Sequence, residues 1–457
     1  MSEEVRKEGD GGGALPQLKL GPIKLAPGIK RSHVLFFILV HGMFLSMLQF
    51  IGIFQPYVLT EILHVGRAEQ GAVTGTLLSA QQLALMIFLL LFGVFADRFG
   101  RRLFMVAGIA GVAIVFLLYP LAFSLSYLLV LRFLFGVGFA SFVAGTGPLR
   151  MDLPDNDSRG RFGAAMGLAN VGLTALLVGL IGTHMPAWLI ERGVSAADAG
   201  RYTFWMAAAL GCLALVATFF GLRRDQPPAL ERQALVENVR FLGRNLRDVF
   251  AYARINPRFR MLLLLAPIMR GDATILGGFL SLWIVNAGAH QGLGSAEAMG
   301  LMGNIAIVLS AGEIIGNVVA GFIADRVNRW KMVIASIALT GISFSTPYWV
   351  SDVTGYAILV VVFLIGFIEG ASNTAAWVFI GEETPAHLRG STASVSQWIG
   401  MVGGMVVGIA GGLLFDKAGY AAPFLLISAM SLAWLAIAFF LYFQRRPTAA
   451  KTGEIPA

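Results

Sequence analysis

Ionisable side chains stand inside long apolar runs of this 457-residue sequence, where a charge costs free energy. The second half of the chain holds Arg270, Asp272, Glu313 and Glu369 in such runs, each near the middle of its run. A carboxyl group removed from water can load and lose a proton near neutral pH. The three acids Asp272, Glu313 and Glu369 therefore predict proton coupling in a desolvated site.

Arg270 is the available counter-ion for one of these acids. If it neutralises Asp272, then Glu313 and Glu369 are left as the proton carriers. Asp272 follows Arg270 by two positions, so a regular helix places the two side chains on different faces. Each is then expected to interact with a different residue. A static buried network of all four side chains is the alternative interpretation.

Further polar and aromatic residues within apolar runs are candidates for binding a solute. The first half adds two ionisable ones, His41 and Arg132. The full set of candidate solute ligands is His41, Gln49, Gln81, Arg132, Arg270, Asn304, Asn373 and Trp377. Each residue type is more often a helix-packing residue than a ligand, so we expect only part of this set at the site.

The composition places most of the chain in a lipid bilayer. It is 57% hydrophobic and 13% charged, whereas a soluble domain carries about 25% charged residues. A spanning helix takes about 20 mostly apolar residues. Twelve runs of this kind lie near 33–60, 70–95, 103–123, 126–148, 162–188, 202–222, 261–286, 299–324, 331–350, 354–380, 392–415 and 420–443. They are too long for the strands of a membrane β-barrel and do not alternate apolar with polar residues.

One long hydrophilic segment, 223–260, divides these runs into six and six. We predict an all-α integral membrane protein with two six-helix bundles, 33–222 and 261–444. The flanking tails are 1–32, which we expect to be disordered, and 445–457. Apolar residues in 223–260 recur at spacings of mostly three and four with Arg around them, which predicts one or two basic amphipathic helices on the cytoplasmic membrane surface. A plain solvated linker is the alternative.

Lys and Arg indicate the orientation. With both ends in the cytoplasm, almost all of them fall on the cytoplasmic side, as membrane proteins prefer. The connections on the other side hold only Arg67, Arg192, Arg201 and Lys417. This asymmetry accounts for the pI of about 9.8 without a nucleic-acid partner. We expect a multi-pass, monomeric protein of a bacterial inner membrane, with lipids as its surroundings.

A short pattern occurs at the end of the second run and again at the end of the eighth. The first copy, GVFADRFGRR, occupies 93–102, and the weaker copy, GFIADRVNR, occupies 321–329. The dipeptide Arg-Gly at 159–160 recurs at 389–390 with nearly the same spacing. Repeats that keep register over half a chain indicate two copies of one structural unit. In membrane proteins, paired halves are typical of secondary transporters, whose solute site lies between the halves.

These motifs resemble those of the major facilitator superfamily. The segment 93–102 resembles the family's signature loop, G-x-x-A-D-R-x-G-R-R. The segment 132–138 resembles its R-x-x-x-G-x-G element, and 382–390 resembles its E-x-x-P-x-x-x-R-G element. The resemblance covers about residues 33–444 and implies twelve helices in two pseudo-symmetric bundles.

In this family the loop aspartate is implied to hold the cytoplasmic ends of the two halves together when the carrier faces outward. The resemblance therefore assigns a cytoplasmic gate to Gly93, Asp97, Arg98, Arg101, Asp325, Arg326, Arg329, Glu382 and Arg389. A carboxylate at such a place can meet the positive N-terminus of a neighbouring helix. The alternative is that these charges only fix the topology.

We expect a secondary active transporter that moves a small organic solute by alternating access and is coupled to protons. The sequence is compatible with symport and with antiport, and with an anionic or an amphipathic solute. Arg132 has two possible roles, in proton traffic or in binding an anion. A proton-driven multidrug efflux antiporter and a facilitative uniporter are the alternatives. The fifth run lacks the Gly-Pro-x-x-Gly-Gly ending of drug exporters, which counts against the multidrug efflux antiporter.

The fourth run also resembles that of spinster-type lipid carriers, with Phe139 in place of their glutamate. We find no metal-ligand spacing, no phosphate-binding loop and no catalytic triad in the sequence. We therefore expect no enzyme activity, no metal and no cofactor, with the proton gradient as the energy source.

Overall fold

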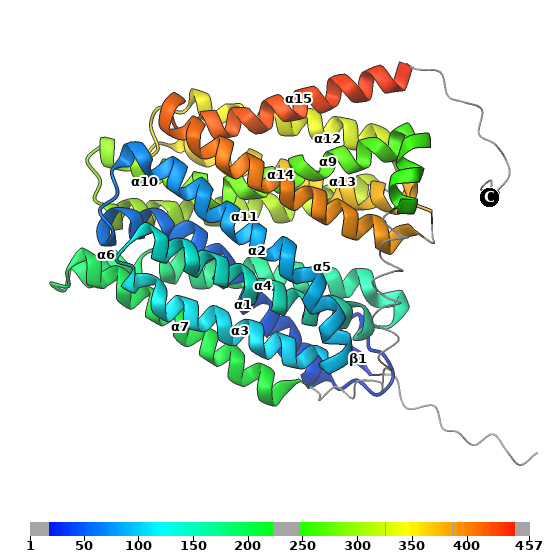
Figure 1. Cartoon of the computed structure of the whole chain (residues 1–457), viewed down its shortest axis with the longest axis horizontal. Coiled ribbons are helices and arrows are strands. Elements are labelled where there is room, and N and C mark those ends of the chain that lie inside the picture. The colour runs from blue at the N-terminus through cyan, green and yellow to red at the C-terminus, as the bar shows by residue number, and fades with distance from the viewer. Residues whose placement is uncertain (1–17, 223–246, 325, 386–387, 444–457) are drawn as a thin grey trace, which may run out of the picture.

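The structure, a computed structural model, describes residues 18–222, 247–324, 326–385 and 388–443. Twelve of the described helices are long and apolar enough to cross a membrane, which confirms the predicted number of spans. Figure 1 shows two stacked groups, with α1 to α7 in one and α9 to α15 in the other.

Several spans consist of more than one helical piece. The first group contains α1 (Arg31–Tyr57), η1 (Val58–Ile62), η2 (Arg67–Glu69), α2 (Gln70–Phe99), α3 (Arg101–Leu118), η3 (Tyr119–Leu121), α4 (Leu125–Asp152), η4 (Asn156–Ser158), α5 (Arg159–Thr174), η5 (Ala175–Gly182), α6 (Met185–Ile190) and α7 (Ala196–Gly221). The second contains α9 (Pro257–Thr274), η6 (Ile275–Phe279), α10 (Leu280–His290), α11 (Ser295–Ala324), α12 (Arg329–Ser343), η7 (Thr346–Trp349), α13 (Tyr356–Glu383), α14 (Arg389–Ala418) and α15 (Ala422–Phe443). The fifth span joins α5, η5 and α6, and the seventh joins α9, η6 and α10.

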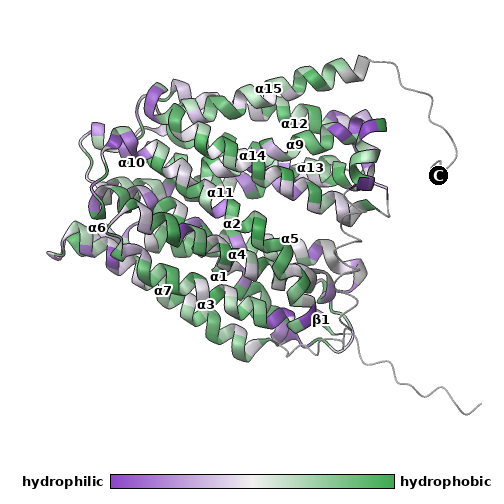
Figure 2. Cartoon of the chain, viewed as in Figure 1, coloured by the Kyte–Doolittle hydropathy of each residue, from purple (hydrophilic) through white to green (hydrophobic). Residues whose placement is uncertain are grey.

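Hydrophilic residues gather at the two ends of the helices, and hydrophobic residues cover their middle parts (Figure 2). We call the end that carries the connections 97–102 and 326–329 the motif end, and the other end the opposite end. Large aromatic residues near the opposite end are strongly exposed, among them Phe123, Trp349 and Tyr356. Such side chains suit the interface between lipid and water.

Capping residues set where two of the helices begin. The sixth span begins at Ala196, earlier than the predicted 202, because Ser195 caps it. The Ser195 hydroxyl accepts from the Asp198 N–H at 3.2 Å and donates to the Asp198 carboxylate at 2.7 Å. The Asn256 side chain caps α9 by accepting from the backbone N–H groups of Arg258 and Phe259 at 3.0 and 3.2 Å. Hydrophobicity alone does not reveal starts that a cap residue determines.

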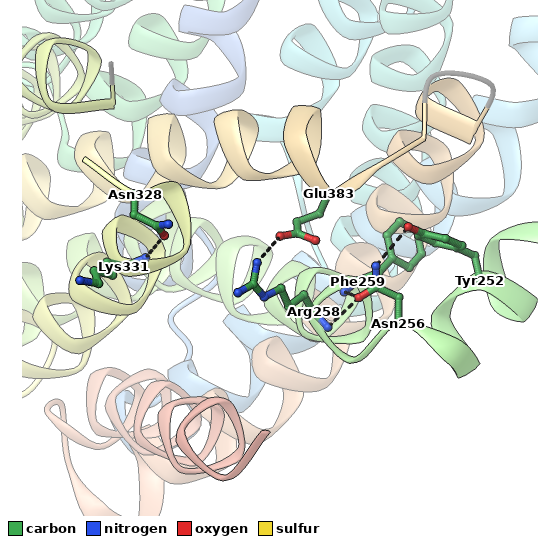
Figure 3. A network of polar contacts seen from close by, with 7 residues as sticks. All are labelled: Tyr252, Asn256, Arg258, Phe259, Asn328, Lys331 and Glu383. Atoms are coloured by element: carbon green, nitrogen blue, oxygen red, sulfur yellow. Dashed lines mark hydrogen bonds and ion pairs between the residues drawn. The ribbon is translucent and has the colours of Figure 1, made fainter. Parts of the chain in front are cut away.

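Among the positions at which the two copies of the repeated motif differ, 100 and 328 mark the boundary between two helices. Gly100 ends α2 with a φ of +100°, a conformation that glycine adopts without strain. In the second copy Asn328 takes this place, and its side chain accepts from the backbone N–H of Lys331 at 3.3 Å (Figure 3). Asn328 is therefore the N-cap of α12, so each copy begins its next helix with a different device.

Glycines allow α11 and α13 to pack backbone to backbone. A Cβ on Gly316 would lie 1.9 Å from the Phe367 carbonyl oxygen, and one on Gly370 would lie 2.2 Å from the Glu313 carbonyl oxygen. Gly312 and Gly316 of α11, like Gly366 and Gly370 of α13, lie four residues apart and each faces the backbone of the other helix, as in other closely packed membrane helices. This contact fixes the position of Glu313 beside α13.

Part of the tail before α1 is folded, although we predicted it to be disordered. We expected residues 1–32 to be disordered, but residues 19–24 form an antiparallel hairpin, β1 (Lys19–Leu20) and β2 (Ile23–Lys24). Leu25 is fully buried, and the Ala26 N–H donates to the Leu153 carbonyl at 3.0 Å. Apolar residues in the tail thus bury against the connection between α4 and α5. Residues 1–17 lie outside the described part of the chain.

The predicted linker helix is described only in part. Residues 247–255 are helical, with Val249 buried and Phe250 exposed. This segment leads directly into the Asn256 cap of α9. Residues 223–246, on which the rest of that prediction falls, lie outside the described residues.

Candidate functional site

A cavity of about 460 Å³ lies between the two bundles. Residues of α1, α2 and α4 form one wall, and residues of α9, α13 and α14 form the other. Its polar and ionisable lining residues are His41, Thr146, Arg150, Arg270, Asp272, Glu369, Asn373, Ser396 and Gln397. Phe139, Phe142 and Trp377 add aromatic surface. A pocket between paired bundles is where a secondary transporter is expected to hold its solute.

Arg270 joins the two bundles at this cavity. Its Nε and Nη2 donate to Oε1 of Gln82 on α2, at 3.3 and 2.7 Å. The pairing of Arg270 with Asp272 that we considered is wrong for this conformation, because Arg270 turns towards Gln82 instead. Two residues apart on α9, Arg270 and Asp272 leave the helix in different directions.

Asp272 is almost fully buried, with 1% of its surface exposed. Its Oδ1 accepts from the backbone N–H of Ala273 at 2.6 Å, and its Oδ2 has no hydrogen-bond partner among the described residues. A buried carboxylate with an unpaired oxygen costs free energy. Asp272 is therefore placed to take up a proton or to meet a ligand in the cavity.

Three helices bring the three predicted acids near one another. Glu369 on α13 lines the cavity with Asp272, and it interacts electrostatically with both Asp272 and Glu313. Glu313 on α11 does not occur among the described residues that line the cavity. The sequence-predicted acids thus form one group, in which Asp272 and Glu369 reach the cavity and Glu313 lies behind them.

The predicted solute ligands divide into two sets. His41, Arg270, Asn373 and Trp377 line the cavity. The other four, Gln49, Gln81, Arg132 and Asn304, do not occur among its lining residues.

Those four residues have other surroundings. Gln49 and Asn304 are exposed, and Gln81 is buried. Arg132 is buried within the first bundle, where it interacts electrostatically with Tyr119 and lies 5.6 Å from the centre of the Phe135 ring. Position within an apolar run was therefore not enough to separate cavity residues from packing residues.

Arg150 and Gln397 also line the cavity, although the sequence did not predict them there. Arg150 lies near the end of α4, among the basic residues that indicate the orientation in the membrane. Only the face of the helix on which it lies could have indicated that it lines the cavity. Residues 139, 143, 146 and 150 follow the three- and four-residue spacing of one helix face. That face lines the cavity up to Arg150.

The bundles touch closely between the cavity and the opposite end. The Ser79 hydroxyl donates to the Met405 carbonyl at 3.0 Å, and the Ser281 hydroxyl donates to the Ile53 carbonyl at 2.5 Å. A Cβ on Gly52 would lie 2.0 Å from the carbonyl oxygen of Gly277. Along α2, Ser79 precedes the cavity-lining residue Leu85, and along α1, which runs the other way, Gly52 and Ile53 follow the cavity-lining residue Leu45. The cavity therefore lies on the motif side of a tight contact between the bundles.

Within the second bundle, polar contacts link the motif-end termini of several helices. Arg258 at the start of α9 lies 3.4 Å from the Glu383 carboxylate at the end of α13, measured Nη1 to Oε1 (Figure 3). The same guanidinium lies 5.7 Å from the centre of the Trp330 ring on α12. Glu383 stands next to Glu382 in the third family-like motif, so that motif includes a charge that binds α9 to α13.

The predicted gate residues are described unevenly. In the first bundle, Arg101 forms an ion pair with Asp152, and Gly93 and Arg98 lie on the last turns of α2. The side chain of Asp97 is not described, nor are those of Glu382 and Arg389, and Asp325 lies outside the described residues.

Arg326 and Arg329 follow α11 at the motif end and are exposed. The predicted gate residues described here thus share one end of the molecule. Their proposed joint action stays a prediction.

Comparison with known proteins defines the class of this fold and site. The family model described as Major Facilitator Superfamily matches residues 34–312 and 268–457. The chain therefore belongs to the major facilitator superfamily, whose members are transporters, and the predicted family and fold are confirmed.

Among curated proteins, the chain is 25% identical over 397 residues to the magnetosome protein MamH of Paramagnetospirillum magneticum, covering 83% of this chain and 87% of that protein. It is 24% identical over 381 residues to the multi-drug resistance efflux pump PmrA of Streptococcus pneumoniae, covering 81% of this chain and 86% of that one. It is also 24% identical over 349 residues to the multidrug resistance protein MdtG of Enterobacter lignolyticus, covering 76% of each.

Solved structures share the fold at low sequence identity. The nucleoside transporter NupG, crystallised as a point mutant, aligns with a TM-score of 0.67 and 12% identity, covering 90% of this chain and 99% of that one. A bacterial homologue of the human lysosomal transporter Spinster, inward-facing and unoccupied, aligns with a TM-score of 0.60 and 15% identity, covering 91% and 96%. These likenesses concern the fold alone.

Proposed function

We propose that this protein is a proton-coupled secondary transporter that moves a small organic solute by alternating access. The observation that carries the proposal is the cavity between the bundles, which holds Asp272 and Glu369 together with Arg270. Acids that face a solute cavity inside a membrane protein are suited to proton transfer. Both acids were predicted from the sequence, and their shared location supports their role.

The conformation fits a carrier that faces the cytoplasm. The bundles meet closely between the cavity and the opposite end, whereas the cavity reaches Arg150 near the motif end. Positively charged residues favour the cytoplasm, and the motif connections are rich in Arg. We therefore assign the motif end and both termini to the cytoplasmic side, with the bacterial inner membrane as the proposed location.

Proton binding and solute binding favour each other in this geometry. When Asp272 and Glu369 are both ionised, their two negative charges balance the positive charges of Arg270 and Arg150, so these four side chains carry no net charge. When both carry protons, the charges of Arg270 and Arg150 can meet an anionic group of the solute. Linkage then requires that the bound anion also strengthens proton binding, which is the coupling that a symporter needs.

The cavity lining supports a solute with an apolar body and one charged or polar group. Trp377, Phe139 and Phe142 offer aromatic surface, while Asn373 and Gln397 offer hydrogen bonds. A small organic anion with an aromatic or aliphatic body suits this set of side chains. We propose that the protein acts as a monomer within the lipid bilayer, since each chain encloses a complete cavity.

The motif end supplies the proposed cytoplasmic gate. When the cavity faces outward, Asp97 near the end of α2 is proposed to meet the N-terminus of a helix in the other bundle, as the family resemblance implies. The surrounding gate residues, including Arg98 and Arg101, would stabilise that closed end.

A multidrug efflux antiporter is the second candidate. It is favoured by the names of two relatives, PmrA and MdtG, and by the mostly apolar and aromatic wall of the cavity. Under this alternative, a cationic drug would compete with protons for Asp272 and Glu369. The two candidates therefore use the same acids and differ in the sign of the solute's charge.

Solute-dependent proton movement in proteoliposomes tests the proposal. Organic acids, sugars, lipids and cationic drugs would be added separately, with a pH-sensitive dye inside the vesicles. Co-movement of protons with an organic acid supports the symporter, and counter-movement with a cationic drug supports the efflux antiporter. Uptake of a solute without any proton signal would contradict proton coupling.

A further inference from the structure

A carboxylate of the second bundle caps a helix of the first. Asp416, near the end of α14, accepts from the backbone N–H of Gly71 through Oδ1 at 2.8 Å. Its Oδ2 accepts from the backbone N–H of Ala72 at 2.7 Å. Gly71 and Ala72 are the second and third residues of α2, so their N–H groups have no partner within that helix. We call these two bonds the Asp416 cap.

The cap is favourable for two physical reasons. A carboxylate forms stronger hydrogen bonds with N–H groups than a neutral acceptor does. The N-terminus of a helix also carries a partial positive charge, which attracts an anion. Asp416 therefore stabilises contact between the bundles at the opposite end of the molecule.

The surrounding backbone leaves room for this contact only because small residues lie there. A Cβ on Gly71 would lie 2.4 Å from Oδ1 of Asp416. One turn further, a Cβ on Gly75 would lie 2.1 Å from the Gly408 carbonyl oxygen. A Cβ on Gly412 would lie 2.3 Å from the Gly71 carbonyl oxygen. The cap thus forms the end of a close-packed seam between α2 and α14.

The two helices in this seam share one design. Each is 30 residues long, and each carries an aspartate at its third-last residue, Asp97 in α2 and Asp416 in α14. Each aspartate begins a short pattern, Asp-Arg-Phe-Gly at 97–100 and Asp-Lys-Ala-Gly at 416–419. Both final glycines have a positive φ, +100° and +93°. The pattern after Asp416 therefore repeats the core of the motif-end loop at the opposite end.

We propose that Asp416 is a positioning residue that holds the opposite end closed while the cavity faces the motif end, and that the cap breaks when the carrier turns outward. Asp416 touches no solute in this arrangement and acts through the relative population of the two conformations. The proposal rests on alternating access, which is part of the proposed function. It assigns to the opposite end the same kind of aspartate that the family resemblance implies at the motif end.

Accessibility of the seam tests the proposal. Leu78 is buried between the bundles and packs close to Gly278 of the other bundle, so a Leu78→Cys reporter should react with a membrane-impermeant maleimide only when the opposite end opens. The measurement uses the full chain in proteoliposomes with Cys212→Ser, which removes the single native thiol. The reagent is added to the side that the opposite end faces.

We expect Asp416→Asn and Asp416→Ala to increase the labelling rate of the reporter about tenfold, the size expected from losing a charged cap. Asp416→Glu should restore part of the protection. Asp352→Asn is the matched control, because Asp352 also accepts hydrogen bonds near the opposite end, including two from Thr354 of its own bundle. This control should leave labelling unchanged.

The possible outcomes distinguish a failure of the cap proposal from a failure of alternating access. If a saturating organic acid, a cationic drug or a proton gradient changes labelling in the unmodified carrier but Asp416→Asn does not, the cap proposal is overturned and alternating access stands. If labelling responds to none of these additions, alternating access itself fails. Should the Asp416 variants not fold, Gly71→Ala keeps the carboxylate but pushes the helices apart. Gly71→Ala should also raise the labelling rate of the Leu78→Cys reporter. An unchanged labelling rate in that variant would overturn the cap proposal.

Discussion

Gln82 on α2 accepts two hydrogen bonds from the Arg270 guanidinium on α9, and this contact joins the two bundles directly at the cavity. Gln82 and Arg270 both lie near Gly404 of α14, where the close contact between the bundles ends and the cavity begins. The pair therefore keeps the charge of Arg270 at the boundary between the closed end and the solute site. The proposed alternating access requires this pair to separate or rearrange when the bundles move.

Replacing Gln82 with Leu tests this relationship. The substitution keeps a similar volume but leaves the Arg270 donors without their acceptor, and a hydrogen bond to a charged group contributes about 1.5–3 kcal/mol. We expect the conformation with the closed opposite end to lose roughly that much stability. Thermal unfolding and thiol accessibility from each side would measure the change. Unaltered values in both measurements would mean that the pair contributes nothing to the equilibrium.

Arg150 should matter for binding an anionic solute and not for folding. Its side chain lines the cavity near the motif end. Arg150→Gln removes one charged hydrogen bond to the solute, so we expect the KM for an organic acid to rise about tenfold or more. Arg67→Gln, an exposed change at the opposite end, is the control and should leave KM as it is. An unchanged KM in Arg150→Gln would remove Arg150 from the solute site.

The packing of α11 on α13 should tolerate no added methyl group. In Gly316→Ala the new Cβ would lie 1.9 Å from a backbone oxygen, so the two helices must move apart. Overpacking of this kind costs about 1–3 kcal/mol, and we expect a lower unfolding temperature and a displaced Glu313. Gly167→Ala is the matched control, because its Cβ would meet nothing within 4 Å. Equal stability of the two variants would contradict the close packing.

The N-terminal hairpin should depend on Leu25. Its side chain is fully buried, and a Leu→Ala change at such a site costs about 2–5 kcal/mol. We expect Leu25→Ala to release the hairpin, so that the amide of Ala26 exchanges its hydrogen faster. Leu18→Ala is the control, since Leu18 is 39% exposed. Slow exchange in Leu25→Ala would show that the backbone bonds hold the hairpin without this side chain.

The sequence predicted the fold well because long apolar runs and repeated motifs are local signals. It also singled out Asp272 and Glu369, which both line the cavity, because an acid is costly in an apolar run and is rarely kept there without a function. Gln82 and Arg150 were harder to assign, because their roles depend on which helix face meets the other bundle. That choice is set by contacts between residues far apart in the chain.

The N-terminal hairpin shows a second kind of structure that the sequence does not predict. Gly21 adopts a positive φ of +56° in its turn, and the strands are only two residues long. A segment this short carries no periodic pattern, so it resembles a polar tail until the surface that buries Ile23 and Leu25 is known. The Asp416 cap is similar, because only the structure brings the end of α14 to the start of α2.

Proton-driven accumulation, compared with solute counterflow, tests the central claim most directly. Counterflow needs solute binding and alternating access but no net proton movement, whereas accumulation needs the coupling acids. We predict that Glu369→Gln and Asp272→Asn retain counterflow and lose accumulation driven by a pH gradient, while Glu313→Gln is affected less because Glu313 lies behind the cavity. Full pH-driven accumulation in both Glu369→Gln and Asp272→Asn would contradict proton coupling through these acids.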